Sequence, residues 1–174
     1  MERSDFQKEE NYQEYERLLL DAAYQDVQFD ADSGGMSAVH VEHCFDKQIG
    51  PFGYRRGRYE LDVLDVFRKK GFRITLESEK SEMNVKHTDG YLNDIPMDIK
   101  TIESTGRWTL RTKFYEAAKQ GAACVVLYFP RRHLYSEERL RLGWEKFVTD
   151  PNSADLIDNI QHLIVVVEKD ILHL

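Results

Sequence analysis

Apolar and polar positions recur with two different periods along the chain, and the changes of period predict the order of its elements. Apolar residues spaced by three and four predict helices over residues 4–24, 58–70, 108–120 and 136–148. Alternating or fully apolar runs predict strands over residues 27–30, 36–43, 72–77, 122–129, 163–167 and 171–174. The run at 122–129 is apolar throughout, so we expect that strand to be buried on both faces.

This order predicts an α+β fold in which a central, mostly antiparallel β-sheet is flanked by helices. The first helix has a strongly acidic polar face, unlike the rest of the chain. We therefore expect residues 1–30 to form an N-terminal helical arm and residues 31–174 to form one α+β domain.

The segment 86–101, KHTDGYLNDIPMDIKT, predicts a β-hairpin that concentrates reactive side chains. Asn93 and Asp94 tolerate the positive φ angles that a two-residue hairpin turn requires. With that turn, Asp89 lies opposite Asp98 on the next antiparallel strand, and both side chains point to the same face. Two facing carboxylates repel each other, so the pair calls for a cation or a shared proton.

The same register places His87 opposite Lys100, on the face that carries the two carboxylates. Lys100 is then the cation beside them, and we expect it on an exposed face where it contributes little to packing. A solvated hairpin face is the alternative reading of this cluster.

Glu60 and His43 are candidate site residues from elsewhere in the chain. Glu60 shares the apolar stripe of its helix with Leu64 and Phe67, where a carboxylate is costly unless it has a partner. It is either an edge residue that reaches solvent or a functional group. His43, like His87, can act as acid or base because imidazole titrates near neutral pH.

A net charge of −7 argues against nucleic-acid binding through bulk electrostatics. Short basic clusters nevertheless recur, and one of them begins the helix that follows the hairpin. We expect Thr101, Arg107, Arg111 and Lys113 to form a nucleic-acid-binding surface beside the hairpin. No apolar run is long enough to span a bilayer and the N-terminus is charged, which predicts a cytoplasmic protein without a membrane partner. The sequence does not indicate an oligomeric state.

The helix with Glu60, followed by Asp89 and then Asp98-Ile99-Lys100, resembles the PD-(D/E)XK group of metal-dependent DNases. In that group the acidic residues hold a divalent metal, and the lysine positions or activates the attacking water. The resemblance implies that Glu60, Asp89 and Asp98 would bind Mg²⁺ or Mn²⁺. Thr88 stands where the group usually has proline.

A longer stretch, residues 38–174, resembles the barnase, EndoU, colicin-D and RelE-like (BECR) nuclease domains of phage, mobile-element and contact-dependent inhibition toxin proteins. The segments that carry the resemblance are SAVHVEHCFD, GRYELDVLDVFRKKGFRITLE, DGYLNDIPMDIKT, KFYEAAKQGAACVVLYFP and HLIVVVEKDILHL. Asp89, Asp98, Lys100 and Thr101 match the hairpin motif, and Gln120 matches a recurrent glutamine at a helix end.

The second resemblance implies a nuclease-like domain that acts as a metal-independent RNase, often on tRNA, and needs no cofactor. Such cleavage requires a base for the ribose 2′-hydroxyl, an acid for the leaving oxygen and cations for the phosphorane charge. This resemblance makes RNA, rather than DNA, the expected partner, and an immunity protein is a possible second partner. A third hypothesis is a nuclease-like fold that has lost activity and serves as an interaction domain.

Overall fold

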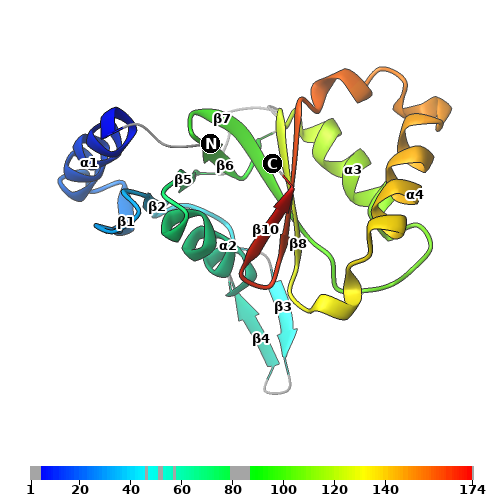
Figure 1. Ribbon diagram of the computed structural model, residues 1–174, viewed down its shortest axis with the longest axis horizontal. Helices are drawn as coiled ribbons and strands as arrows, with labels where there is room; N and C mark the ends of the chain where they lie inside the picture. The colour runs from blue at the N-terminus through cyan, green and yellow to red at the C-terminus, as the bar shows by residue number, and fades with distance from the viewer. Residues whose placement is uncertain (1–4, 46, 51–52, 57, 79–86, 174) are drawn as a thin grey trace. The chain divides into compact units, whose positions relative to one another are not determined.

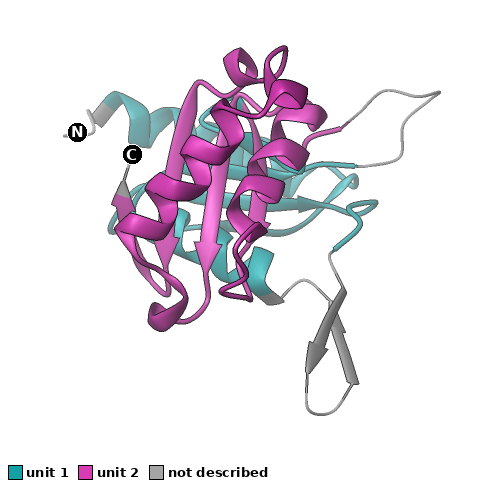
Figure 2. Cartoon of the chain, turned by 90° about the vertical axis from the view of Figure 1, so that its right-hand side faces the viewer, with its two compact units in different colours: residues 1–83, 89–95 teal, residues 84–88, 96–174 magenta. Residues whose placement is uncertain are grey.

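The computed structural model describes residues 5–45, 47–50, 53–56, 58–78 and 87–173 (Figure 1). The chain divides into two compact units (Figure 2). Unit 1 comprises residues 1–83 and 89–95, and unit 2 comprises residues 84–88 and 96–174. The elements confirm the α+β class with an N-terminal helix. None of the described helices is long and apolar enough to cross a membrane, and the cytoplasmic location stays a prediction.

Unit 1 contains two helices and four strands hydrogen-bonded in the order β1-β2-β5-β6. Strands β1 and β2 are antiparallel, β2 and β5 are parallel, and β5 and β6 are antiparallel. A separate antiparallel pair is formed by β3 and β4. The bounds are α1 (Asp5–Leu19), β1 (Tyr24–Phe29), β2 (Met36–His40), β3 (Lys47–Gly50), β4 (Gly53–Arg56), α2 (Arg58–Lys69), β5 (Arg73–Leu76) and β6 (Gly90–Leu92).

Helix α1 is fastened to the rest of unit 1 by apolar packing and by a buried amide. Leu18 packs in a small core with Met36 and Ala38. The buried Asn11 side chain donates hydrogen bonds to the carbonyl oxygens of Gly34, at 2.8 Å, and Gly71, at 3.3 Å. The helix ends at Leu19, earlier than expected, because the chain enters β1 at Tyr24. The boundary between an arm and a domain at residue 30 stays a prediction.

Unit 2 holds the strands β7, β8, β9 and β10 in that order, with α3 and α4 lying across them (Figure 2). Strands β7, β8 and β9 are parallel neighbours, and β9 and β10 are antiparallel. Over both units the described pairings are mixed, four antiparallel and three parallel. The bounds are β7 (Ile95–Thr101, its first residue in unit 1), α3 (Thr109–Gln120), β8 (Cys124–Phe129), α4 (Glu137–Val148), β9 (His162–Val167) and β10 (Asp170–His173), with 3-10 turns at Arg132–Leu134, Pro151–Ser153 and Ile157–Asn159.

The core of unit 2 forms between the two helices and one face of β8. Val125, Leu127 and Phe129 pack there with Phe114 of α3 and Phe147 of α4. The alternate residues of β8 are buried as well. This confirms that β8 is covered on both faces.

Local signals mark the ends of elements close to the predicted helix bounds. Gly121 adopts φ 82° after α3 and donates its N–H to the last turn of that helix. Ser136 accepts a hydrogen bond from the Arg139 N–H at the start of α4. Asn93 and Asp94 have φ angles of 47° and 68°, which confirms a two-residue turn between β6 and β7.

Candidate functional site: a buried aspartate and lysine

Strand β7 presents Asp98 and Lys100 toward the helices of unit 2. In the parallel ladder, Asp98 is paired with Val125 and Lys100 with Leu127. Directly paired residues of neighbouring strands point to the same face of a sheet. Because Val125 and Leu127 pack against α3 and α4, the two polar side chains lie on that same covered face.

The two side chains form a buried ion pair that is fixed by the end of α3. The Lys100 Nζ lies 2.8 Å from Asp98 Oδ2. It also donates a hydrogen bond of 2.8 Å to Oε1 of Gln120. The Asp98 side chain is 0% exposed and that of Lys100 is 13% exposed. The expectation that Lys100 lies on an exposed face is therefore wrong, because α3 covers this part of β7.

The Asp98 carboxylate has capacity to bind a cation beyond Lys100. Neither of its oxygens accepts a well-directed hydrogen bond from the described residues, so its contact with Lys100 is ionic. A buried carboxylate oxygen without a hydrogen bond is costly. Its charge and oxygen donors suit Mg²⁺ or Mn²⁺, which bind through one or two carboxylates and keep several waters.

Unit 1 buries a second pair of candidate residues, His43 and Glu60. The His43 Nε2 lies 2.9 Å from Glu60 Oε1, and its Nδ1 lies 2.8 Å from the carbonyl oxygen of Glu77. A carbonyl only accepts, so the contact with Glu77 places a proton on Nδ1. The two side chains are 0% and 4% exposed.

This pair excludes the reading of Glu60 as an edge residue that reaches solvent, because its carboxylate is a buried partner of an imidazole. The sequence signal was a carboxylate on the apolar stripe of its helix. Such a carboxylate requires a partner, but the sequence does not identify His43 as that partner. With both ring nitrogens engaged inside unit 1, His43 is held as a positioned side chain rather than as an open acid or base.

The remaining hairpin candidates lie beside these groups in the chain. The His87 Nε2 is buried and has no hydrogen-bond partner among the described residues. The Asp89 carbonyl accepts a hydrogen bond of 2.8 Å from the Glu77 N–H, and its facing of Asp98 stays a prediction. Thr101 is half-buried at the end of β7.

Two of the three predicted cations have their charges paired. Arg111 forms an ion pair with Asp150, and Lys113 lies 2.9 Å from Glu116. Arg107 is exposed, and its guanidinium lies over the Trp108 ring. None of the described ion pairs joins Arg107 to a carboxylate, so its positive charge is not cancelled in that way.

The Arg111 ion pair predicts a specific pH dependence. The Arg111 guanidinium, together with the Asn152 N–H, lowers the pKa of Asp150 below its ordinary value. A carboxyl whose folded pKa is lowered adds stability above its unfolded pKa, and that stability is lost as the pH falls through the folded pKa. We expect Arg111→Leu to raise the Asp150 pKa and to reduce the stability lost on acidification.

Titration of the Asp150 carboxyl by NMR measures this pKa directly. Arg141→Leu serves as the control, because Arg141 is an exposed arginine of α4 that pairs with Glu145. An Asp150 pKa unchanged in Arg111→Leu would contradict the assignment.

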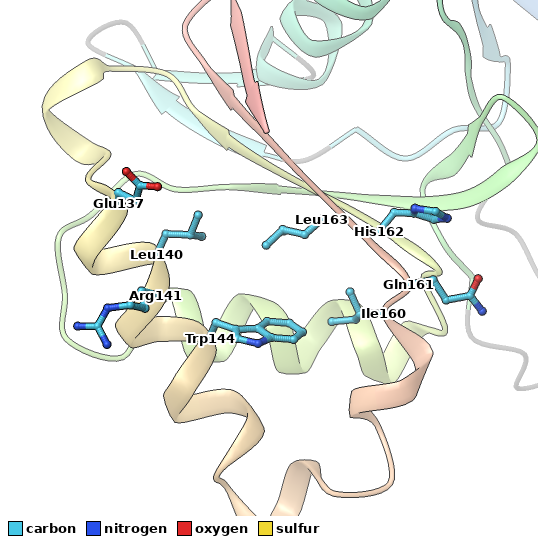
Figure 3. A pocket seen from close by; sticks show the side chains of 8 residues that line it. All are labelled: Glu137, Leu140, Arg141, Trp144, Ile160, Gln161, His162 and Leu163. Atoms are coloured by element: carbon cyan, nitrogen blue, oxygen red, sulfur yellow. The ribbon is translucent and has the colours of Figure 1, made fainter. Parts of the chain in front are cut away.

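A cavity of about 560 Å³ lies in unit 2 between α4 and the start of β9. Leu140, Trp144, Ile160 and Leu163 give it an apolar lining, and Figure 3 shows Glu137 and Arg141 at one end and Gln161 and His162 at the other. None of the predicted site residues lines it, so this cavity does not belong to the Asp98–Lys100 site.

Among the described residues, no group of three or more His, Cys, Asp or Glu side chains is arranged to hold a metal ion. Comparisons of the chain with protein-family models, with curated proteins and with solved structures found no match.

Proposed function

We propose that the chain is a metal-dependent phosphodiesterase that cleaves nucleic acid. One observation carries this proposal: a fully buried Asp98 carboxylate touches the Lys100 ammonium and has no directed hydrogen bond from the described residues. The sequence order Glu60, Asp89, Asp98-Ile99-Lys100 supports it, because it resembles metal-dependent DNases.

Each side chain has a defined task in such a reaction. Asp98 would hold Mg²⁺ or Mn²⁺ through its carboxylate oxygens. The bound ion would neutralise charge on the phosphate oxygens. Lys100, whose position is fixed by Gln120, would donate hydrogen bonds that orient the attacking water or stabilise the charge developing on the phosphoryl oxygens.

Cleavage assays with and without metal test the proposal. We expect the purified chain to cleave labelled RNA or DNA with Mg²⁺ or Mn²⁺, to lose that activity in EDTA, and to regain it when metal is added in excess. Assays of both nucleic acids, single- and double-stranded, would identify the substrate. Asp89→Asn should lower the rate as strongly as a change at Asp98 if Asp89 is a ligand.

The metal-independent RNase is a second candidate, and the buried His87 Nε2, which has no hydrogen-bond partner among the described residues, favours it. It requires that RNA cleavage survive EDTA and that His87→Ala abolish it. A chain that cleaves neither nucleic acid with or without metal would exclude both enzyme proposals. The interaction-domain hypothesis would then take their place.

A further inference from the structure

The charged residues that line a cleft of about 220 Å³ in unit 2 are all basic. The cleft lies between the loop that precedes α3 and the side of α4 that carries Gly143. Arg107, Arg139 and Lys146 line it, and none of the described acidic residues does. At Gly143 of α4, an added Cβ would lie 2.5 Å from the Leu110 Cβ, so the two helices pack closely at this cleft.

The cations of the cleft are positioned by neutral groups. Arg139 donates to the carbonyl oxygens of Leu134 and Ser104, the second at 3.1 Å, and Lys146 donates to the Arg107 carbonyl at 2.9 Å. A hydrogen bond to a carbonyl fixes a side chain but leaves its charge uncancelled. None of the described ion pairs involves these three residues, whereas Arg111, Lys113 and Arg141 each have a carboxylate partner.

An exposed aromatic ring stands beside these cations. The Trp108 side chain is 55% exposed, although tryptophan is usually largely buried. The Lys146 Nζ lies 4.7 Å from its ring centroid and the Arg107 guanidinium carbon lies 5.2 Å from it. A solvent-exposed aromatic ring next to cations is the combination that binds single-stranded nucleic acid, where bases stack and phosphates pair with the cations.

We infer that this cleft binds one nucleotide unit of a single strand, with a phosphate among Arg107, Arg139 and Lys146 and the base against Trp108. This inference rests on the proposed nuclease function only because it takes nucleic acid as the ligand. The site is separate from Asp98 and Lys100 in its residues, and it lets a chain of net charge −7 hold a polyanion through a local positive surface.

Binding of a fluorescein-labelled DNA 12-mer and a 2′-O-methyl RNA of the same sequence, followed by anisotropy in EDTA, tests the inference. Neither strand is cleaved under these conditions, because metal is absent and the 2′-hydroxyl is absent or blocked. One phosphate neutralised in a single strand predicts a slope of log K against log salt of about −0.7. Arg107→Gln should weaken binding by about threefold to tenfold and bring that slope closer to zero.

Trp108→Ala should weaken binding by about fivefold to a hundredfold through lost stacking, and Trp108→Phe should restore much of it. Arg141→Gln, which removes a carboxylate-paired arginine of α4, is the matched control and should bind like the wild type. Tighter binding of either strand type identifies the strand that the site prefers.

Wild-type binding by both Arg107→Gln and Trp108→Ala would overturn the inference. So would equal weakening by Arg141→Gln, or binding of heparin as tight as that of the oligonucleotide and unaffected by Trp108→Ala. Oligonucleotide binding in a chain that cleaves nothing would leave the inference standing and remove the proposed nuclease. If Arg107→Gln and Trp108→Ala both bind and cleave like the wild type, the inference falls and the proposed nuclease remains.

Discussion

Asp98→Asn is expected to lower metal-dependent cleavage by at least about a thousandfold. The substitution keeps the side-chain volume but removes the charge that would hold the cation. A metal's stabilisation of phosphate charge is worth several kcal/mol, and each 1.4 kcal/mol changes a rate about tenfold. Rates measured with saturating Mn²⁺, alongside manganese binding by calorimetry, check both the rate and its cause.

The same substitution should also destabilise the fold. It leaves the Lys100 ammonium buried without its counter-charge, and breaking a buried ion pair in this way costs about 3–5 kcal/mol. The double variant Asp98→Asn with Lys100→Gln should recover most of the stability but none of the activity. The double variant therefore separates loss of cleavage from loss of folding.

Asp94→Asn is the matched control, because it makes the same change in the same hairpin at a residue that is 79% exposed. It should cleave like the wild type, since asparagine also tolerates the positive φ at this turn position. Wild-type cleavage by a folded Asp98→Asn would reject the metal-dependent proposal.

Phe114→Ala is expected to lower the free energy of unfolding by about 3–5 kcal/mol, the usual cost of emptying a buried aromatic site. The Phe114 side chain is fully buried. Its ring centroid lies 5.1 Å from that of Trp144 and 5.8 Å from that of Phe147, so its removal leaves a cavity where α3 meets α4. Urea unfolding followed by far-UV circular dichroism measures the change.

Phe6→Ala provides the comparison, because Phe6 is 72% exposed on α1 and its loss should change stability by less than about 0.5 kcal/mol. A loss below about 1 kcal/mol for Phe114→Ala would mean that Phe114 is not a central residue of this core.

The sequence by itself determined the elements whose signals are local. The two positive-φ residues at the hairpin turn, the Gly121 stop and the Ser136 cap act within one turn of backbone, and each is present where predicted. The sequence also predicted the β8 strand, because a run of six apolar residues has no polar face that could be exposed to water.

Strand partners and side-chain neighbours depended on the tertiary structure. The β7–β8 and β2–β5 ladders are parallel, and parallel partners join segments far apart in sequence, so no local pattern specifies them. An alternating strand shows which residues share a face but not which face is covered. For that reason the sequence could place Asp98 with Lys100 but could not tell that α3 buries them.

The charges followed the same division between sequence and tertiary structure. The sequence named Arg107, Arg111 and Lys113 together because they are close in the chain. Only the folded chain decided that Asp150 cancels the charge of Arg111, while Arg107 joins the distant Lys146 beside Trp108. Ion pairs form between groups a few ångströms apart in space. The sequence separation of two charged residues fixes the distance between them only when they lie within about one helical turn. For charged residues farther apart in this region, the packing of α3 on α4 sets the distance.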